Sequence, residues 1–94
     1  MASMFIKHRV ADFDVWKPIF DEHEATRVRE GQTGHSLHRD SDDPNVIIIA
    51  FRVADLARAK AFAESNNLKE TMQRAGVEGP PEIWFAEDIE EKTY

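Results

Sequence analysis

VIIIAFRV, residues 46–53, is the most apolar run of the chain and its clearest predicted strand. Its apolar residues are almost continuous, which predicts a strand that is covered on both faces. The preceding SDDPN, residues 41–45, predicts a turn, because Asp and Asn favour turn backbones and proline presets φ. Before that turn, GHSLHRD at 34–40 is a second, more polar strand candidate. The two strands are therefore predicted to form an antiparallel hairpin.

The N-terminal part of the chain predicts one strand and one long helix. MFIKHRV, residues 4–10, is short, aromatic and β-branched, and alternation puts four of its residues on one face: Met4, Ile6, His8 and Val10. FDVWKPIFDEHEATRVREG, residues 13–31, predicts a single amphipathic helix. Asp12 or Asp14 is suited to cap the start of this helix, and Gly31 is suited to end it.

The part of the chain after the hairpin predicts a helix in two pieces and a last strand. ADLARAKAFAES, residues 54–65, is rich in alanine and predicts a helix. Ser65 is suited to cap the second helical piece, NNLKETMQRAG at 66–76. VEGPP at 77–81 predicts a loop because of its glycine and its two prolines. EIWFAED at 82–88 predicts the final strand.

The predicted order of elements is βαββαβ, the ferredoxin-like α+β arrangement of a four-stranded antiparallel sheet with the helices on one face. We expect residues 1–94 to form one domain, because a chain of this length rarely divides into two. Residues 89–94 are expected to fray as an acidic tail. Met4 is an alternative natural start, which would leave residues 1–3 outside the domain.

The predicted helices leave the other face of the sheet without a cover. Because the strand at 46–53 is apolar, leaving that face in water would expose a patch that is unusual in a monomer. A second copy packed sheet to sheet would cover this patch. We therefore expect a homodimer, in which the two sheets close a dimeric α+β barrel.

The composition excludes several classes of function. Hydrophobic residues make up 41% of the chain and charged residues 32%, as in a globular protein. The net charge of −6 and the pI near 5.1 argue against binding to nucleic acids or to anionic membrane surfaces. The absence of cysteine excludes disulfides, thiolate catalysis and zinc–thiolate sites, and it favours the cytoplasm. The sequence has no apolar run of membrane-spanning length and no signal-peptide pattern.

Three segments carry a resemblance to a known family: DDPN at 42–45, FAESNNLKETMQRAGV at 62–77 and GPPEIWF at 79–85. With the order of elements, they make residues 4–87 similar to the small dimeric α+β-barrel proteins. Within this superfamily, the chain resembles the antibiotic-biosynthesis-monooxygenase-like group and its short, mostly uncharacterised, cyclase-like bacterial members. The resemblance implies a ligand pocket between the helices and the concave face of the sheet. Relatives of this kind include cofactor-independent monooxygenases acting on polycyclic aromatic substrates and polyketide cyclases, and the resemblance assigns no catalytic residue.

The apolar stripe of the helix predicted at 13–31 is continued by two polar residues. At about 100° per residue, Trp16, Phe20, His23 and Arg27 fall within a sector about 60° wide. A histidine titrates near neutral pH and suits acid–base catalysis, and an arginine suits a carboxylate or an oxyanion. His23 and Arg27 are therefore catalytic candidates. Trp16 and Phe20 are candidates for the aromatic walls of a substrate-binding pocket.

The alternative is a structural role for both polar residues. His23 would then be a core histidine with a partner inside the chain. Arg27 would reach past the end of the helix to solvent, or pair with Glu24, Glu30 or a strand carboxylate.

Two further histidines lie on the strand predicted at 34–40. His35 and His38 are three residues apart, so they lie on opposite faces of a regular strand. One of the two should face the helices and lie near His23, and both are substrate-binding candidates. No histidine spacing typical of a metal site is present, so we expect neither a metal nor a cofactor.

Two functions stay open on these grounds. One is a cofactor-independent monooxygenase or cyclase-like enzyme that acts on an apolar or aromatic small molecule. The other is a non-catalytic ligand-binding or stress-associated dimer. The enzyme should have a cavity of at least a few hundred Å³, roughly the size of a small-molecule pocket, with His23 unpaired and pointing into it. A filled cavity, with His23 and Arg27 paired inside the chain, would favour the non-catalytic function, and an extended oligomer would favour a mere assembly module.

Overall fold

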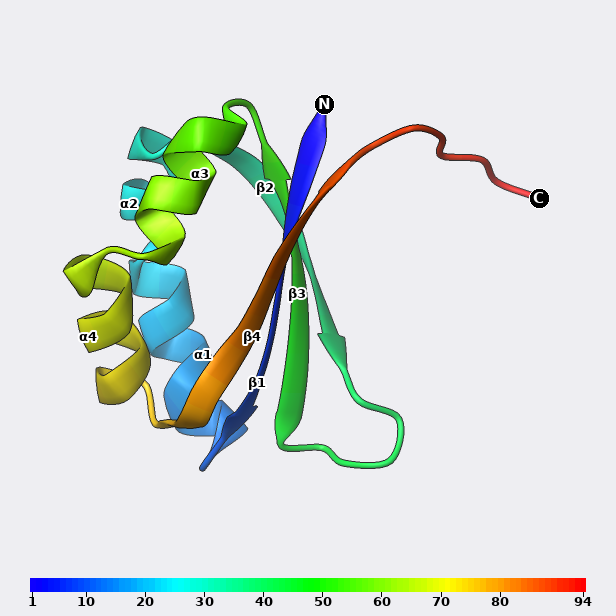
Figure 1. The fold of residues 1–94 in the computed structure, drawn as a ribbon. Helices are drawn as coiled ribbons and strands as arrows, with labels where there is room; N and C mark the ends of the chain where they lie inside the picture. Colours follow the sequence, from blue (N-terminus) through cyan, green and yellow to red (C-terminus); the bar gives the residue numbers. More distant parts are fainter.

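The computed structural model describes residues 1–94 as a sheet with one layer of helices (Figure 1). The elements are β1 (Ala2–Val10), α1 (Phe13–Glu22), α2 (Glu24–Arg29), β2 (Gln32–Arg39), β3 (Val46–Val53), α3 (Leu56–Ala63), α4 (Asn66–Arg74) and β4 (Val77–Glu87). The four strands form one sheet in the order β2-β3-β1-β4, and every neighbouring pair is antiparallel. All helices cover the same face of the sheet (Figure 1). The predicted ferredoxin-like fold is therefore confirmed.

The strand that was most evident from the sequence lies in the interior of the sheet. β3 spans the predicted residues and pairs with β2 on one side and with β1 on the other. Its side chains alternate between buried and partly exposed, with Ile47, Ile49 and Phe51 buried. The face of β3 that points to the helices is thus covered, and the opposite face is only half-covered by the chain itself.

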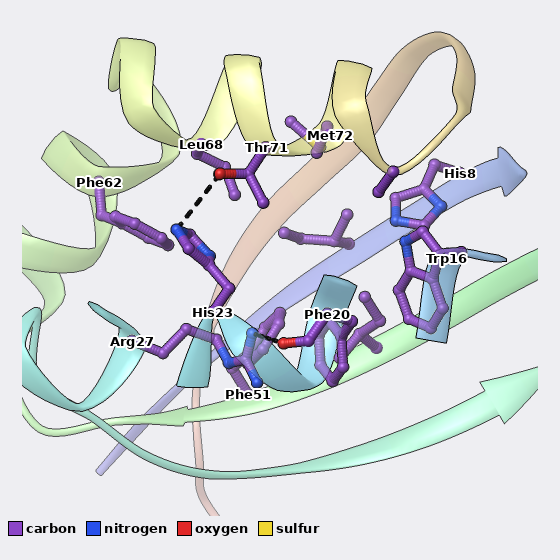
Figure 2. A pocket seen from close by; sticks show the side chains of 13 residues that line it. His8, Trp16, Phe20, His23, Arg27, Phe51, Phe62, Leu68, Thr71 and Met72 are labelled. Carbon is purple, nitrogen blue, oxygen red and sulfur yellow. Dashed lines mark hydrogen bonds between the residues drawn. The ribbon is translucent and has the colours of Figure 1, made fainter. Parts of the chain in front are cut away.

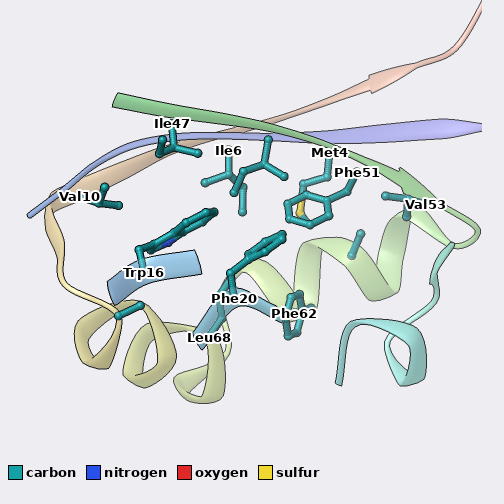
Figure 3. Close-up of a cluster of buried hydrophobic side chains, with 13 residues drawn as sticks. Met4, Ile6, Val10, Trp16, Phe20, Ile47, Phe51, Val53, Phe62 and Leu68 are labelled. Carbon is teal, nitrogen blue, oxygen red and sulfur yellow. The ribbon is translucent and has the colours of Figure 1, made fainter. Parts of the chain in front are cut away.

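The core lies between the sheet and the helices (Figure 3). It consists of thirteen buried hydrophobic residues: Met4, Ile6, Val10, Trp16, Phe20, Ile47, Ile49, Phe51, Val53, Ala59, Phe62, Leu68 and Ala75. β1 and β3 contribute alternate residues to this core, as the predicted alternation of β1 requires. His8 shares the buried face of β1 with Met4, Ile6 and Val10.

The sheet face that points away from the helices is called the outer face here. It carries Phe5, Lys7, Ile48, Ala50, Arg52 and Trp84. Residues 88–94 have no regular secondary structure, and they extend away from the helix layer (Figure 1). None of the helices is both long enough and apolar enough to cross a membrane.

The prediction of a single helix over residues 13–31 was wrong. His23 interrupts it, with φ −81° and ψ −1°, so that α1 ends and α2 begins there. In a continuous helix the carbonyl of Phe20 would accept from the N–H of Glu24. Here that carbonyl accepts instead from the N–H of His23 and from Nη1 of Arg27. The side chain of Arg27, seven residues further along the chain, therefore occupies a carbonyl at the point where the helix breaks.

The prediction of a loop at 77–81 was also wrong. These residues form the first part of β4, where Val77 pairs with Val10 and Glu78 with Arg9. A register shift in β1 accompanies this stretch, and Gly79 adopts a positive φ of 72° that L side chains rarely adopt. Prolines are tolerated here because β4 lies at the edge of the sheet, where a strand needs donors on one side only.

Candidate ligand site

A small cavity lies between the helices and the sheet (Figure 2). Trp16, Phe20, His23 and Arg27 all line it, which confirms that they share one face despite the break at His23. The rest of the wall comes from β1, β3, α3, α4 and the residue after α4: Ile6, His8, Ile49, Phe51, Phe62, Leu68, Thr71, Met72 and Ala75. This helix–sheet cavity is therefore apolar, with a few polar groups at defined places in its wall.

The helix–sheet cavity is much smaller than an enzyme site of this kind requires. Its volume is about 40 Å³, whereas small-molecule pockets range over a few hundred Å³ and more. The space is filled mainly by aromatic rings, since Trp16 stacks on Phe20 with 4.7 Å between the ring centroids. A drug-sized ligand can enter only if side chains or a helix move.

His23 is held by α4. Its Nε2 lies 2.6 Å from Oδ1 of Asn67 and 3.4 Å from Oγ1 of Thr71, and with the proton on Nε2 it donates to the amide oxygen. The ring also stacks on Phe62, with 5.9 Å between the centroids. His23 is thus a buried histidine with partners inside the chain, as the structural alternative expects, and it joins the α1–α2 junction to α4 (Figure 2).

Arg27 is buried but lacks a carboxylate partner. Only 5% of its surface is exposed, and it takes part in none of the ion pairs of the structure. Nη1 donates to the carbonyl of Phe20 at 2.7 Å, and the guanidinium carbon lies 3.9 Å from the centroid of the Phe20 ring. Nη2 has no hydrogen-bond partner. Burial lowers the pKa of Arg27, against the opposing field of Glu24 and Asp21.

His8 lines the helix–sheet cavity, although the sequence did not single it out as a site residue. It is 6% exposed, and its ring meets Trp16 edge-on with 5.6 Å between the centroids. Nδ1 of His8 has no hydrogen-bond partner. Burial lowers the pKa of His8, and the polar backbone of His8 itself opposes this shift. The available signal was its place in the alternation of β1, where it takes a core position between Ile6 and Val10.

The structure separates the two histidines of β2. His35 faces the helices and meets Phe20 edge-on, with 5.0 Å between the ring centroids. His38 lies on the outer face, where its Nε2 is 3.1 Å from Oγ of Ser36. The opposite orientation expected from their spacing is confirmed, but neither residue lines the helix–sheet cavity. No three His, Asp or Glu side chains come together as metal ligands.

Comparison with known proteins identifies the fold. No family model and no curated protein matches the sequence. Solved structures do match: SnoaB, a cofactor-independent oxygenase from Streptomyces nogalater, has 14% identity and a TM-score of 0.74, over 96% of this chain and 94% of that one. A candidate antibiotic biosynthesis monooxygenase from Bordetella bronchiseptica has 14% identity and a TM-score of 0.77, over 94% of this chain and 96% of that one. The chain therefore has the ferredoxin-like fold of the antibiotic biosynthesis monooxygenase-like proteins.

Proposed function

We propose that the chain is a homodimeric member of the antibiotic-biosynthesis-monooxygenase-like group, and that it binds a small apolar or aromatic molecule between its helices and its sheet. The observation that carries this proposal is the make-up of the helix–sheet cavity. Its wall is mostly aliphatic and aromatic, and two buried polar groups in it, Nδ1 of His8 and Nη2 of Arg27, have no partner. Apolar walls with a few directed polar groups are typical of small-molecule sites.

The outer face supports a second copy as the partner. Phe5 and Trp84 stack there with 5.4 Å between their ring centroids, and Trp84 is 44% exposed. The partly exposed Ile48 and Ala50 of β3 extend this apolar surface. A face of this kind matches itself across a twofold axis, because each copy then covers the aromatic and aliphatic residues of the other.

Charged residues border this face. Residues 87–91, which are mostly acidic, border a hollow on the outer face that is also lined by Phe5 and Arg52. The net charge of −6 on each copy opposes association, so the apolar residues of the outer face have to outweigh this repulsion for the dimer to form.

Entry of a ligand requires the cavity to widen, and α4 is the element best suited to move. Leu68 is its only buried residue, so α4 contributes little apolar burial of its own. Its movement would break the hydrogen bonds of His23 with Asn67 and Thr71, which now hold α4 to the α1–α2 junction. Displacement of α4 would open the space that Leu68 and Met72 now close.

A second candidate function is cofactor-independent oxygenation, and the unpaired Nδ1 of His8 favours it. Burial keeps this imidazole neutral at pH 7, so it is able to accept a proton from a bound aromatic substrate. The resulting carbanion would add O₂ to form a peroxide anion, which takes the proton back from His8. Loss of water, with the second hydrogen of the same carbon, would then leave a ketone. His23 is less suited to this role, because its Nε2 is already engaged by α4.

The experiment uses the two tryptophans as internal probes. In a ¹⁵N-labelled protein, Trp16 reports on the helix–sheet cavity and Trp84 on the outer face. Titration with benzyl alcohol, a neutral aromatic probe, should shift the indole N–H resonance of Trp16 and the backbone resonances of α4. The resonance of Trp84 should stay in place. A shift at Trp84 alone, or no shift, would contradict the proposed site.

A further inference from the structure

Arg27 is a buried cation whose charge is not neutralised by an ion pair. Removing a guanidinium from water is costly unless its donors find partners, and an anion is the partner that repays most. One of its donors, Nη1, binds the Phe20 carbonyl, while Nη2 has no partner. The nearest acidic residue on its own helix, Glu24, is exposed and makes no ion pair with it. Arg27 therefore has both a charge and a donor available for a ligand.

A second cavity lies on the other side of Arg27, between α2 and β2. Its volume is about 80 Å³, and its polar lining residues are Glu24, Arg27, Gln32, Thr33 and His35. Gln32 is only 4% exposed, yet neither atom of its side-chain amide has a hydrogen-bond partner. Two buried polar side chains with unpaired atoms, Nη2 of Arg27 and the amide of Gln32, thus border the same space. Arg27 and Phe51 also line the helix–sheet cavity, so the two cavities are neighbours.

We infer that the cavity between α2 and β2 binds the carboxylate of a ligand whose apolar part occupies the helix–sheet cavity, an inference that rests on the proposed function. Nη2 of Arg27 and Nε2 of Gln32 are the donors, and a carboxylate offers each of them an oxygen. The volume suits a group of this size, since about 80 Å³ holds roughly two to three water-sized groups. One guanidinium balances one negative charge, which favours a carboxylate over a phosphate dianion.

His35 fits the same arrangement. Burial and the positive field of Arg27 lower its pKa, so its imidazole is neutral at pH 7 and adds no second charge to the cavity. Glu24, at the rim, carries the only negative charge among the lining residues and disfavours ligands with more than one negative charge. The ligand class is therefore an aromatic or apolar monocarboxylic acid.

The test compares sodium benzoate with benzyl alcohol, at equal ionic strength set with sodium chloride, and adds sodium acetate as the isolated head group. Binding of benzoate should shift the side-chain amide of Gln32, the Nε–H of Arg27 and the indole of Trp16. Arg27→Met should weaken benzoate binding by about 10- to 100-fold, the range expected for a lost charge-assisted hydrogen bond. The same variant should change the affinity for benzyl alcohol much less than that for benzoate, because the neutral alcohol gains no charge-assisted hydrogen bond from Arg27. Arg29→Met is the matched control, because Arg29 lies on the same helix but is exposed.

The three probes separate this inference from the proposed function. Benzyl alcohol that binds at Trp16 as tightly as benzoate, in both wild type and Arg27→Met, would refute the carboxylate site and leave the apolar site in place. Acetate that shifts Gln32 in an Arg27-dependent way, without any shift of Trp16 by benzyl alcohol, would support the carboxylate site and refute the apolar one. No response to any probe would refute both. Should Arg27→Met fail to fold, Gln32→Met tests the same site while it keeps the charge of Arg27. Weaker binding of benzoate to Gln32→Met would support the carboxylate site, and unchanged binding would refute it.

Discussion

Ile48→Asp tests the expected dimer most directly. Ile48 is the outer-face residue of β3 that lies between Lys7 of β1 and His38 of β2. In an isolated chain, an aspartate at this place would be partly exposed and beside a lysine, so cross-strand attraction would keep the fold intact. In a dimer, this carboxylate would be buried at the interface. Because a twofold axis relates the two copies, the interface would contain two buried carboxylates.

The size of the effect follows from these two environments. Ile48 is already mostly covered within its own chain, so dimerisation gains at most about a third of the full burial energy of an isoleucine, up to about 1 kcal/mol per copy. Desolvation of the new carboxylate beside Lys7 costs at least about 1 kcal/mol per copy after the attraction is counted. The two copies together lose about 3 to 4 kcal/mol, which raises the dissociation constant of the dimer by roughly 100- to 1,000-fold.

Sedimentation equilibrium measures this change over a wide range of protein concentration. Wild type should sediment as a dimer of the 10.8 kDa chain, and Ile48→Asp as a monomer with an unchanged circular dichroism spectrum. Val28→Asp is the matched control, because Val28 is an exposed apolar residue on α2, with 64% of its surface accessible, and lies far from the outer face. A wild-type monomer, or a dimeric Ile48→Asp, would refute the argument from the outer face.

Two further predictions concern the histidines of the site. Asn67→Ala should lower the free energy of unfolding by about 1 kcal/mol and raise the rate of hydrogen exchange in α4 above that in α3, because His23 loses the hydrogen bond of 2.6 Å to Asn67. Asn66→Ala is the control, because Asn66 is an exposed neighbour on the same helix. Equal exchange rates in the two variants would contradict the role of His23 in holding α4. The second concerns pH: the pKa of His8 is lowered from 6.5, so the unfolded chain binds the proton first, and stability should fall as the pH decreases below 6.5. In chemical denaturation, the free energy of unfolding of His8→Leu should depend less on pH in this range than that of wild type. The remaining pH dependence is due to His35, whose pKa is also lowered. An unchanged pH dependence would mean that His8 has the same pKa in the folded and the unfolded state.

Local sequence signals predicted most of the elements because their causes lie within a few residues. Alternation assigned the buried face of β1, and the cap at Ser65 divided the second helical segment where α4 begins. The 3.6-residue period also placed Trp16, Phe20, His23 and Arg27 on one face, and the cavity they line confirms it. The same period did not predict the helix break at His23, because it carries no information on which donor hydrogen-bonds to the carbonyl of Phe20.

The sequence by itself determined the βαββαβ order, the strand at 46–53 and the shared face of the four helix residues, since all of these depend on local periodicity and turn chemistry. Only the tertiary structure decided what those residues do. It joined His23 to Asn67, 44 positions further along, buried Arg27 without a carboxylate, brought His8 against Trp16 and closed the cavity to about 40 Å³. It also turned residues 77–81 into an edge strand. These outcomes depend on packing between segments far apart in the chain, and packing is a property of three-dimensional complementarity that no local pattern encodes.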